Sequence, residues 1–379
     1  MPSRRLPAVA AAAAAVLAAS PATARAAEAL HGFTAANELV TFHSDSPGAM
    51  RALTPVSGLA PGERLVALDL RARTGQLYAL ASSSRLYTVN PISGAATAVG
   101  GAFTPLLAGT SFGMDVDQRA DRLRVVSDGR QNLRLNPEDG QVAGHDAPLA
   151  YAAGDEGEGS NPGTGAAAFT QPAEGQPQLF VIDSARNVLA TTPAPAQGQL
   201  TTVGPLGVDL QEAVSFDIAS DGTAWVAGRR AGANGSELFK VDLGTGKLSA
   251  GAKRPGIGVA GGIVALTAAG RVPDDTTRPS VLLSTDTARS VVSARRSFKV
   301  LVSCSEACGL AATLRRGKRV LARGEGGLSR AGRTSVTMKP TKAARRLAKR
   351  GKAFEAIVSV TAGDAAANHA RTSRKVRFG

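Results

Sequence analysis

Three aspartates that end short apolar runs are the first residues of the sequence whose type and spacing point to chemistry. Asp69, Asp115 and Asp217 close the runs LVALD, SFGMD and AVSFD, and Thr170 and Thr267 close two related runs. Carboxylates that converge in space can bind calcium or a cationic ligand, because calcium prefers hard oxygen donors. An Asp at a strand end more often accepts hydrogen bonds from the turn that follows, and the sequence favours that structural role. We therefore expect no resident cofactor, with calcium as the alternative.

A second set of polar residues gathers in the stretch 111–140, which reads SFGMDVDQRADRLRVVSDGRQNLRLNPEDG. Strand alternation places Arg122 and Arg124 on one face, and Arg134 can approach from the next strand, so a site for a carboxylate or a sugar is one interpretation. A cross-strand network with neighbouring acids is the other, and we favour it. The candidate ligand-binding residues in this stretch are Asp117, Asp121, Arg122, Arg124, Asn132 and Arg134.

The same stretch contains part of a calcium-loop pattern. Asp115, Asp117 and Asp121 occupy the first, third and seventh positions of such a loop, but Val126 stands where a bidentate Glu is required. The pattern is too incomplete to predict a calcium loop.

The longest irregular segment is the run GDEGEGSNPGTG at 154–165. Long loops on a rigid scaffold often bind ligands, and here Asp155 and Asn161 are the candidate residues. A flexible connector between two structural repeats explains the composition equally well.

No catalytic residue is predicted. The chain has no HExxH or phosphate-binding glycine loop, and no nucleophile motif adjoins His31, His43, His145 or His369. Acids from different repeats could still meet in space as a glycosidase-like pair. A non-catalytic binding or scaffolding protein is therefore our first hypothesis, and a hydrolase or lactonase using the strand-end acids, with or without calcium, is the alternative.

The elements that would position these residues form a repeat. The strand-end polar positions at 69, 115, 170, 217 and 267 are 46, 55, 47 and 50 residues apart, which is the spacing of propeller blades. Three further strands can be found in most intervals, and four strands make one blade. Residues 30–53 supply a second, third and fourth strand without a first, whereas 262–267 supply a first strand alone, so joining them would close the ring. We predict an all-β chain with a five-bladed β-propeller, or six blades if two are merged.

The repeat also predicts what faces the propeller axis. A small residue lies two positions before each strand-end polar residue, and alternation puts both on one face. Those small residues are Ala67, Gly113, Ala168, Ser215 and Ala265, and the opposite face carries Leu68, Met114, Phe169, Phe216 and Leu266. If the first strands line the axis, the small residues fill its narrow part and the Asp and Thr residues form a ring at one mouth.

The runs DRLRVVSD and GRQNLRLNPEDG, followed by YAAGDEGEGSNPGTGAAAFT at 151–170, resemble the bacterial family called domain of unknown function 4394. The resemblance covers about residues 30–270. It implies a secreted propeller-like module, and it brings no established activity or catalytic residue with it.

A different pattern follows the polar linker at 273–279. Alternating runs within 280–379, such as SFKVLVSCS and AFEAIVSVTAGD, predict a small antiparallel β-sandwich, interrupted by one short basic helix at 341–352. This region resembles the immunoglobulin-like or fibronectin-like C-terminal modules of exported bacterial proteins. Cys304 and Cys308 are the only cysteines, which predicts a local disulfide in an oxidising compartment rather than a zinc site.

The N-terminus indicates export, and the charge distribution indicates association with a polyanion. Residues 1–26 have the basic, apolar and small-residue parts of a secretory signal peptide, so the propeller is expected to occupy 27–272 and the protein to be secreted, in contact with the cell wall or free of it. No later segment is apolar enough to cross a membrane.

From Thr276 onward there are 23 Lys and Arg against five Asp and Glu, while 27–275 have seven more acids than bases. The basic region is expected to associate with an anionic envelope polymer or polysaccharide, whereas nucleic acid is not expected because aromatic residues are scarce there. Protein partners are not predicted.

Overall fold

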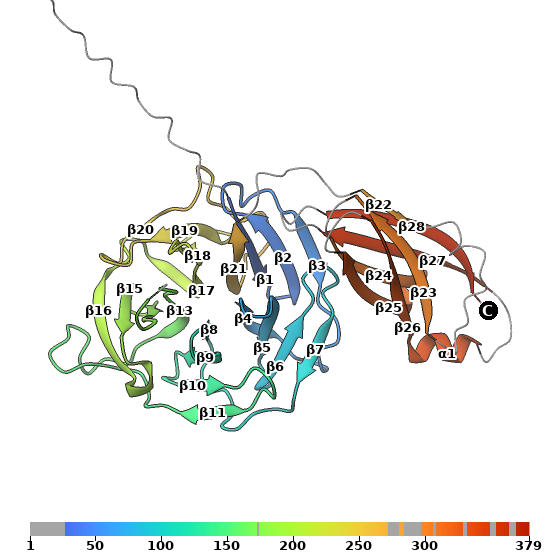
Figure 1. Cartoon of the computed structure of the whole chain (residues 1–379). Coiled ribbons are helices and arrows are strands. Elements are labelled where there is room, and N and C mark those ends of the chain that lie inside the picture. The colour runs from blue at the N-terminus through green and yellow to red at the C-terminus, as the bar shows by residue number, and fades with distance from the viewer. Residues whose placement is uncertain are drawn as a thin grey trace, which may run out of the picture.

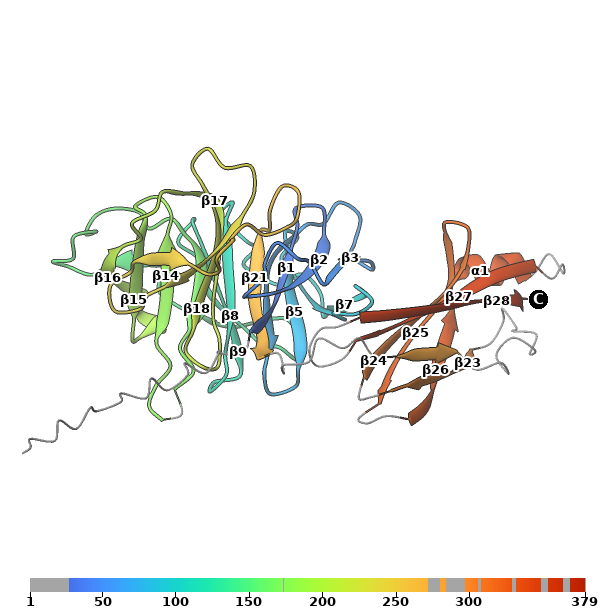
Figure 2. The same cartoon turned by 90° about the horizontal axis from the view of Figure 1, so that it is seen from above.

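The computed structural model describes residues 27–172, 174–271, 280–283, 297–305, 308–328, 332–348, 354–363 and 369–378. Its N-terminal part is a ring of five β-sheets arranged around an axis, and its C-terminal part is a smaller β-structure that lies beside the sheets of β1–β3 and β4–β7 (Figures 1 and 2). The predicted signal peptide (1–26) and linker (273–279) lie outside the described residues.

Each sheet of the ring is a blade that runs from an inner strand to an outer one. The inner strands are β21 (Ala265–Arg271), β4 (Leu65–Arg71), β8 (Phe112–Asp117), β13 (Thr164–Phe169) and β17 (Leu210–Ile218). The second strands are β1 (Glu28–Phe33), β5 (Gln76–Ala81), β9 (Arg122–Ser127), β14 (Leu179–Asp183) and β18 (Ala224–Arg230). The third strands are β2 (Glu38–His43), β6 (Arg85–Val89), β10 (Asn132–Leu135), β15 (Val188–Thr192) and β19 (Glu237–Val241). The fourth strands are β3 (Ala52–Pro55), β7 (Ala96–Val99), β11 (Val142–His145), β16 (Gln199–Pro205) and β20 (Leu248–Ala250).

Five blades, and not six, are present, and the ring closes as the repeat predicted. β21 pairs antiparallel with β1, with Gly32 opposite Leu266 and His31 opposite Thr267, so one blade combines both ends of the propeller sequence. Closure gives β21 a strand partner and covers the edge of β1 that would otherwise be unpaired. The inner strands contact one another around the ring in the order β21, β4, β8, β13 and β17, and β17 returns to β21.

The fourth blade is larger than the repeat predicted. β12 (Ala150–Tyr151) pairs parallel with β16 and adds a fifth strand to the outer edge, and the 3₁₀ helix η1 (Pro195–Gln197) precedes β16. The extra strand accounts for the longest interval of the repeat, 55 residues, which separates positions 115 and 170.

The C-terminal region has seven strands in one nearly closed sheet. Their order is β22-β23-β26-β25-β24-β27-β28, and the end strands β22 and β28 contact each other. The bounds are β22 (Val281–Leu283), β23 (Phe298–Cys304), β24 (Cys308–Arg316), β25 (Arg319–Leu328), β26 (Gly332–Pro340), α1 (Lys342–Ala348), β27 (Phe354–Gly363) and β28 (His369–Phe378). Only two residue pairs join β25 to β26, so the sheet folds there into two layers over one core.

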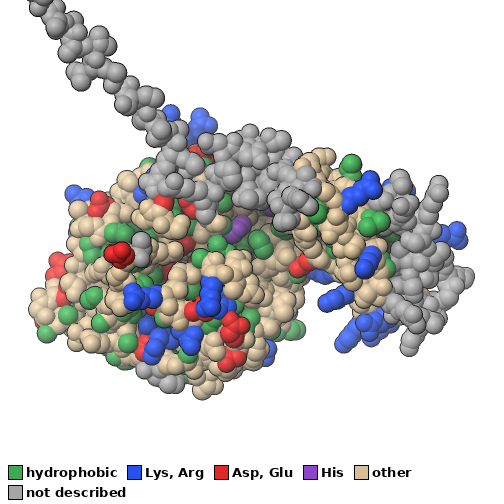
Figure 3. Space-filling view, viewed as in Figure 1, with side chains coloured by type: hydrophobic (Ala, Val, Ile, Leu, Met, Phe, Trp, Pro, Cys, Tyr) green, Lys and Arg blue, Asp and Glu red, His purple; other side chains and the backbone are tan. Residues whose placement is uncertain are grey.

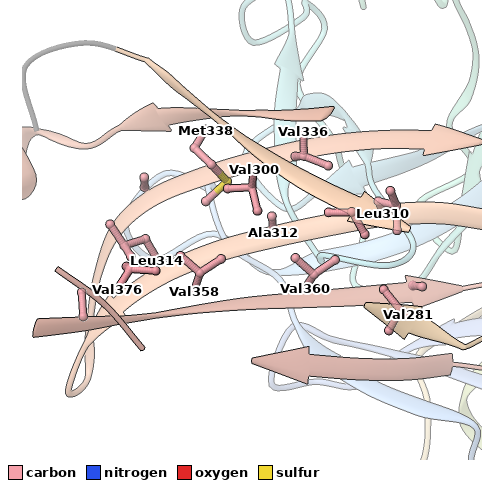
Figure 4. Packing of buried hydrophobic residues seen from close by; sticks show 14 of the residues in the cluster. Val281, Val300, Leu310, Ala312, Leu314, Val336, Met338, Val358, Val360 and Val376 are labelled. Carbon is pink, nitrogen blue, oxygen red and sulfur yellow. The ribbon is translucent and has the colours of Figure 1, made fainter. Parts of the chain in front are cut away.

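Apolar side chains fill the space between the two layers. Val300 of β23, Val336 of β26 and the β27 residues Val358 and Val360 are buried in this space (Figure 4). Cys304 and Cys308 form the predicted disulfide, and α1 occupies the first part of the predicted helical segment. No helix in the described part of the chain is long and apolar enough to span a membrane.

Candidate functional site: the axial pocket and the buried carboxylates

A cavity of about 810 Å³ opens on the propeller axis, where the inner strands begin. All five blades contribute to its wall, and the blade of β21 supplies Ala35 and Val264. The remaining wall residues are Arg64, Leu65, Val66, Thr110, Ser111, Phe112, Asp128, Gly163, Ser184, Ala185, Leu210, Gln211 and Arg229. Its volume is that of a site for a small molecule.

Below this axial pocket the channel narrows to a volume of about 10 Å³. Four of the five predicted small residues line this segment, and Ala166 takes the place predicted for Ala168. The four are Ala67, Gly113, Ser215 and Ala265. A Cβ atom on Gly113 would lie 2.6 Å from the backbone nitrogen of Ala167, so glycine is needed for β8 to approach β13. The narrow segment separates the axial pocket from the other end of the inner strands.

The three strand-end aspartates converge on the axis beyond the narrow segment. Asp69, Asp115 and Asp217 are 5%, 2% and 5% exposed, so they are buried rather than placed at an open mouth. Desolvation raises the pKa of Asp115, and the charges of Asp69 and Asp217 raise it further, as expected for carboxyl groups that lie near one another.

Each carboxylate accepts a hydrogen bond from the next blade. Asp69 accepts a hydrogen bond from the backbone N–H of Val116 at 2.7 Å. Asp115 accepts one from Phe169 at 3.1 Å, and Asp217 accepts one from Ala268 at 2.5 Å. The aspartates therefore accept hydrogen bonds from the neighbouring inner strand, a partner different from the following turn that the sequence favoured.

This pattern corrects the predicted repeat in the blade of β13. The N–H donors Val116, Phe169 and Ala268 occupy equivalent positions in their blades. Val116 directly follows Asp115 and Phe169 directly follows Ala168, so Ala168 is the residue equivalent to Asp115. Thr170 lies two residues further on and exchanges hydrogen bonds with Gln178. The axial ring consists of three Asp, one Thr and one Ala.

Burial and mutual repulsion raise the pKa of the axial aspartates. Desolvation raises the pKa of Asp69 and of Asp115 well above the ordinary carboxyl value, and the charge of Asp217 adds to both shifts. Desolvation also raises the pKa of Asp217. The hydroxyl of Thr267 lies 2.7 Å from Asp69 Oδ1 and 3.0 Å from Asp217 Oδ2, yet it has only one proton to donate. A protonated carboxyl group would supply the second hydrogen.

We expect the propeller to lose stability as the pH rises above the ordinary Asp pKa of about 3.9. The folded state binds more protons than the unfolded state across that range, because the folded pKa values are raised. Asp115→Asn removes one of these groups and keeps an oxygen for the Phe169 N–H. The stability lost between pH 5 and pH 8 should therefore be smaller in this variant than in the unchanged chain.

Urea unfolding at several pH values measures this difference, and the exposed Asp45→Asn provides the control. A pH dependence in Asp115→Asn that equals that of the unchanged chain would show that the axial carboxyl groups are not protonated in the fold.

The same geometry bears on calcium. Within the described ranges, no group of three His, Cys, Asp or Glu side chains is placed to hold a metal ion. Most of the axial carboxylate oxygens already accept hydrogen bonds, although Asp115 Oδ1 is buried without a partner. Calcium binding by Asp69, Asp115 and Asp217 stays a prediction that this arrangement does not favour.

The predicted polar group of 111–140 separates into two ionic networks. In the first, Arg124 and Arg134 lie opposite each other on β9 and β10 and both bind the buried Asp146. Arg124 also donates to Asn132 at 2.6 Å, and Asn132 donates to the Pro195 carbonyl of η1 in the next blade at 2.7 Å. Desolvation lowers the pKa of Arg124. This is the cross-strand network that the sequence favoured.

The second network joins the blades of β4 and β8 through a residue that the sequence did not single out. Arg71 binds both carboxylate oxygens of Asp121, at 2.7 and 2.5 Å, and binds Glu138 at 2.7 Å. These hydrogen bonds raise the pKa of Arg71, and the same guanidinium lowers the pKa of Asp121. Arg71 follows Asp69 by two positions on an apolar strand, and that spacing on the axial face is the signal that could have identified it.

The other predicted residues do not meet at one site. Asp117 accepts backbone N–H groups of the β8–β9 turn, and Arg122 donates to the carbonyl of Asp121. Asp155 accepts hydrogen bonds from the N–H and the hydroxyl of Thr202, which hold the 154–165 loop against β16. Burial raises the pKa of Asp155, but these and other hydrogen bonds outweigh it, so the pKa is lowered. Asn161 is exposed.

The polar groups that are free to bind lie instead in the axial pocket. Among the described residues, the side chains of Arg64, Ser111, Gln211 and Arg229 have no hydrogen-bond or ion-pair partner. Asp128 is the acid of the wall, and both of its oxygens accept hydrogen bonds from Thr110. The predicted site omits these residues. Ser111 and Asp128 lie within the stretch 111–140, but other charged and amide residues of that stretch were the candidates, and Arg64, Gln211 and Arg229 lie outside every motif. Arg64 and Ser111 do directly precede inner strands, however, so their place in the repeat is a usable signal.

The family model described as Domain of unknown function (DUF4394) matches residues 38–258. The chain belongs to this family. The DUF4394 match begins at β2 and ends before β21, so it spans most of the propeller and leaves out the two strands whose pairing closes the ring.

Solved structures match the DUF4394 chain only distantly. A protein of unknown function from Bacteroides thetaiotaomicron VPI-5482 is 13% identical, with a TM-score of 0.37 over 52% of this chain and 53% of that one. The nidogen/laminin complex is 10% identical, with a TM-score of 0.39 over 64% of this chain and 98% of that one. A glycoside hydrolase is 11% identical, with a TM-score of 0.39 over 82% of this chain and 89% of that one. The match covers about half the length of the first of these structures. No curated protein matches the chain.

Proposed function

We propose that the DUF4394 propeller is a non-catalytic binding module whose ligand occupies the axial pocket, and that the C-terminal region keeps the exported protein close to an anionic polymer of the envelope. The axial pocket carries the proposal. It is lined by all five blades and contains polar side chains without internal partners. Such groups are satisfied by water or by a ligand, and rigid strands fix their positions.

The placement of the acids supports binding over hydrolysis. A propeller hydrolase or lactonase would need carboxyl groups beside its substrate, but Asp69, Asp115 and Asp217 do not line the axial pocket. They lie beyond the narrow segment, and each accepts a backbone hydrogen bond from the neighbouring blade. Among the described wall residues there is one carboxyl group, that of Asp128, and no histidine, so they form neither a pair of acids nor a serine–histidine pair around a substrate.

Blocking the axial pocket should abolish ligand binding without unfolding the propeller. Ala35 and Ala36 are neighbouring exposed residues of one turn, and only Ala35 lines the pocket. We expect Ala35→Trp to weaken, by tenfold or more, every small molecule that binds the unchanged chain, while Ala36→Trp leaves binding unaltered. Saturation-transfer NMR with mixtures of sugars, organic acids and amino acids measures this. If no compound binds, or if both variants bind equally, the axial pocket is not the site.

A basic surface of the C-terminal region supports association with a polyanion. Arg315, Ile357 and Lys375 lie in one row across β24, β27 and β28, and Arg371 and Arg377 share the strand face of Lys375. The four basic residues in this group are exposed. Lys and Arg side chains predominate on the visible part of this region (Figure 3). Exposed positive charges gathered on one face attract anionic polymers in a salt-dependent manner, and one acid, Glu355, lies opposite Arg377 on this face.

Retention of the full chain on immobilised alginate should fall as the salt concentration rises. Replacing Arg315, Arg371 and Lys375 together by Gln should lower the eluting salt concentration markedly, because neighbouring charges act jointly on a polyanion. The control replaces Lys247, Lys253 and Arg254, which are exposed on the propeller. Retention that is absent, insensitive to salt or equal in both triple variants would contradict the proposed anchoring.

A further inference from the structure

We propose that the ligand of the axial pocket is a small hydroxylated organic anion, whose charged group lies between Arg64 and Arg229. This inference rests on the proposed function, because it assumes that the axial pocket is the binding site. It goes further by assigning the chemical class of the ligand from the groups in the wall.

The two arginines are the first part of the reasoning. Arg64 precedes β4 and Arg229 lies near the end of β18, so they come from the two blades that flank the blade of β21. Both are exposed to the pocket space, and neither has an acidic or hydrogen-bonding partner among the described side chains. Elsewhere in the propeller, buried arginines are paired with acids, as Arg71 and Arg124 show. A guanidinium left unpaired in a concave site is suited to a carboxylate or a phosphate, which it binds with two parallel hydrogen bonds.

Asp128, the acid among the described wall residues, does not neutralise this pair. Asp128 belongs to the blade of β8 and is held by the N–H and the hydroxyl of Thr110. These hydrogen bonds, opposed by burial, lower the pKa of Asp128, so it stays ionised and can accept but not donate. An anionic group is therefore repelled from the Asp128 side and attracted to the arginine side.

The rest of the wall is suited to hydroxyl groups. Ser111 and Gln211 have free side chains that donate and accept, and Asp128 retains lone pairs that can accept from a ligand hydroxyl. The apolar wall is limited to Leu65, Val66, Phe112, Leu210 and Val264 together with alanines. A carboxylate or phosphate at one end of a polyhydroxylated body matches this distribution, as in a uronic acid, an aldonic acid or a sugar phosphate.

Isothermal titration of the full chain with D-glucuronate, D-gluconate and D-glucose 6-phosphate tests the proposal, with D-glucose and D-glucitol as neutral counterparts. At least one anion should bind, and its neutral counterpart should bind at least tenfold more weakly. Arg64→Gln and Arg229→Gln should each weaken the anion by about tenfold or more, equivalent to at least about 1.4 kcal/mol. The exposed Arg254→Gln, which lies outside the wall, should leave binding unchanged.

The outcomes separate this inference from the proposed function. Neutral sugars that bind as well as the anions, and are lost in Ala35→Trp, would overturn the anionic class while leaving the pocket as the site. Anion binding that survives both arginine substitutions would overturn the assigned residues. If none of the three anions binds, the inferred ligand class is wrong, and the mixtures used for Ala35→Trp decide whether the pocket binds another class. Circular dichroism of each variant verifies that the fold is retained.

Discussion

Arg71→Met is expected to destabilise the propeller by about 3–5 kcal/mol, because it leaves carboxylates without their buried partner. The side chain of Arg71 is 5% exposed, and it holds Asp121 through two hydrogen bonds and Glu138 through a third. These contacts connect the blades of β4 and β8. Urea unfolding, followed by the fluorescence of Trp225 in the propeller, measures the loss.

A neighbouring arginine provides the matched control. Arg73 also pairs with Asp121, but its side chain is 71% exposed, so Arg73→Met should cost less than about 1 kcal/mol. Adding Asp121→Asn to Arg71→Met should restore part of the stability, because it removes the uncompensated carboxylate. Equal effects of Arg71→Met and Arg73→Met would mean that the buried network does not hold the two blades together.

Gly32→Val is expected to destabilise the propeller by about 3 kcal/mol, near the upper end of overpacking effects. A Cβ atom at Gly32 would lie 2.8 Å from the carbonyl oxygen of Ala265 and 2.9 Å from Ile263 Cδ1. The added side chain would therefore separate β1 from β21 and strain the closing blade. The melting temperature of the propeller, again followed through Trp225, should fall by several degrees.

The control for closure is a glycine with open space around it. A Cβ atom on Gly235 would meet no atom within 4 Å, so Gly235→Val should change stability little. If both variants melt at the temperature of the unchanged chain, the pairing of β1 with β21 contributes little to holding the ring closed.

The architecture was predictable because blade strands are short, alternate in polarity and recur at a regular interval. The missing first strand at 30–53 and the unpaired one at 262–267 together indicated the closing blade, and β21 does pair with β1. The predicted repeat is misaligned in the blade of β13, where it equates Thr170 with Asp115. A shift of two residues leaves every side chain on the same face of a strand, so alternation could not distinguish Thr170 from Ala168.

The site was less predictable for a physical reason. The axial aspartates accept hydrogen bonds from backbone N–H groups of another blade, and such donors have no side-chain signature in the sequence. The predicted cluster of Arg124, Asn132 and Arg134 does form, but Asp146 and η1 use its hydrogen-bonding groups within the fold. Arg64 and Arg229 lie on different blades, 165 positions apart, and only ring closure brings them to one pocket.

The position of a bound anion tests the central claim most directly. A crystal structure of the full chain with the anion that binds best should show its charged group between Arg64 and Arg229 and its hydroxyl groups toward Ser111 and Asp128. An anion found only on the basic C-terminal surface, or only on the outer face of a blade, would contradict the assignment of the axial pocket as the ligand site.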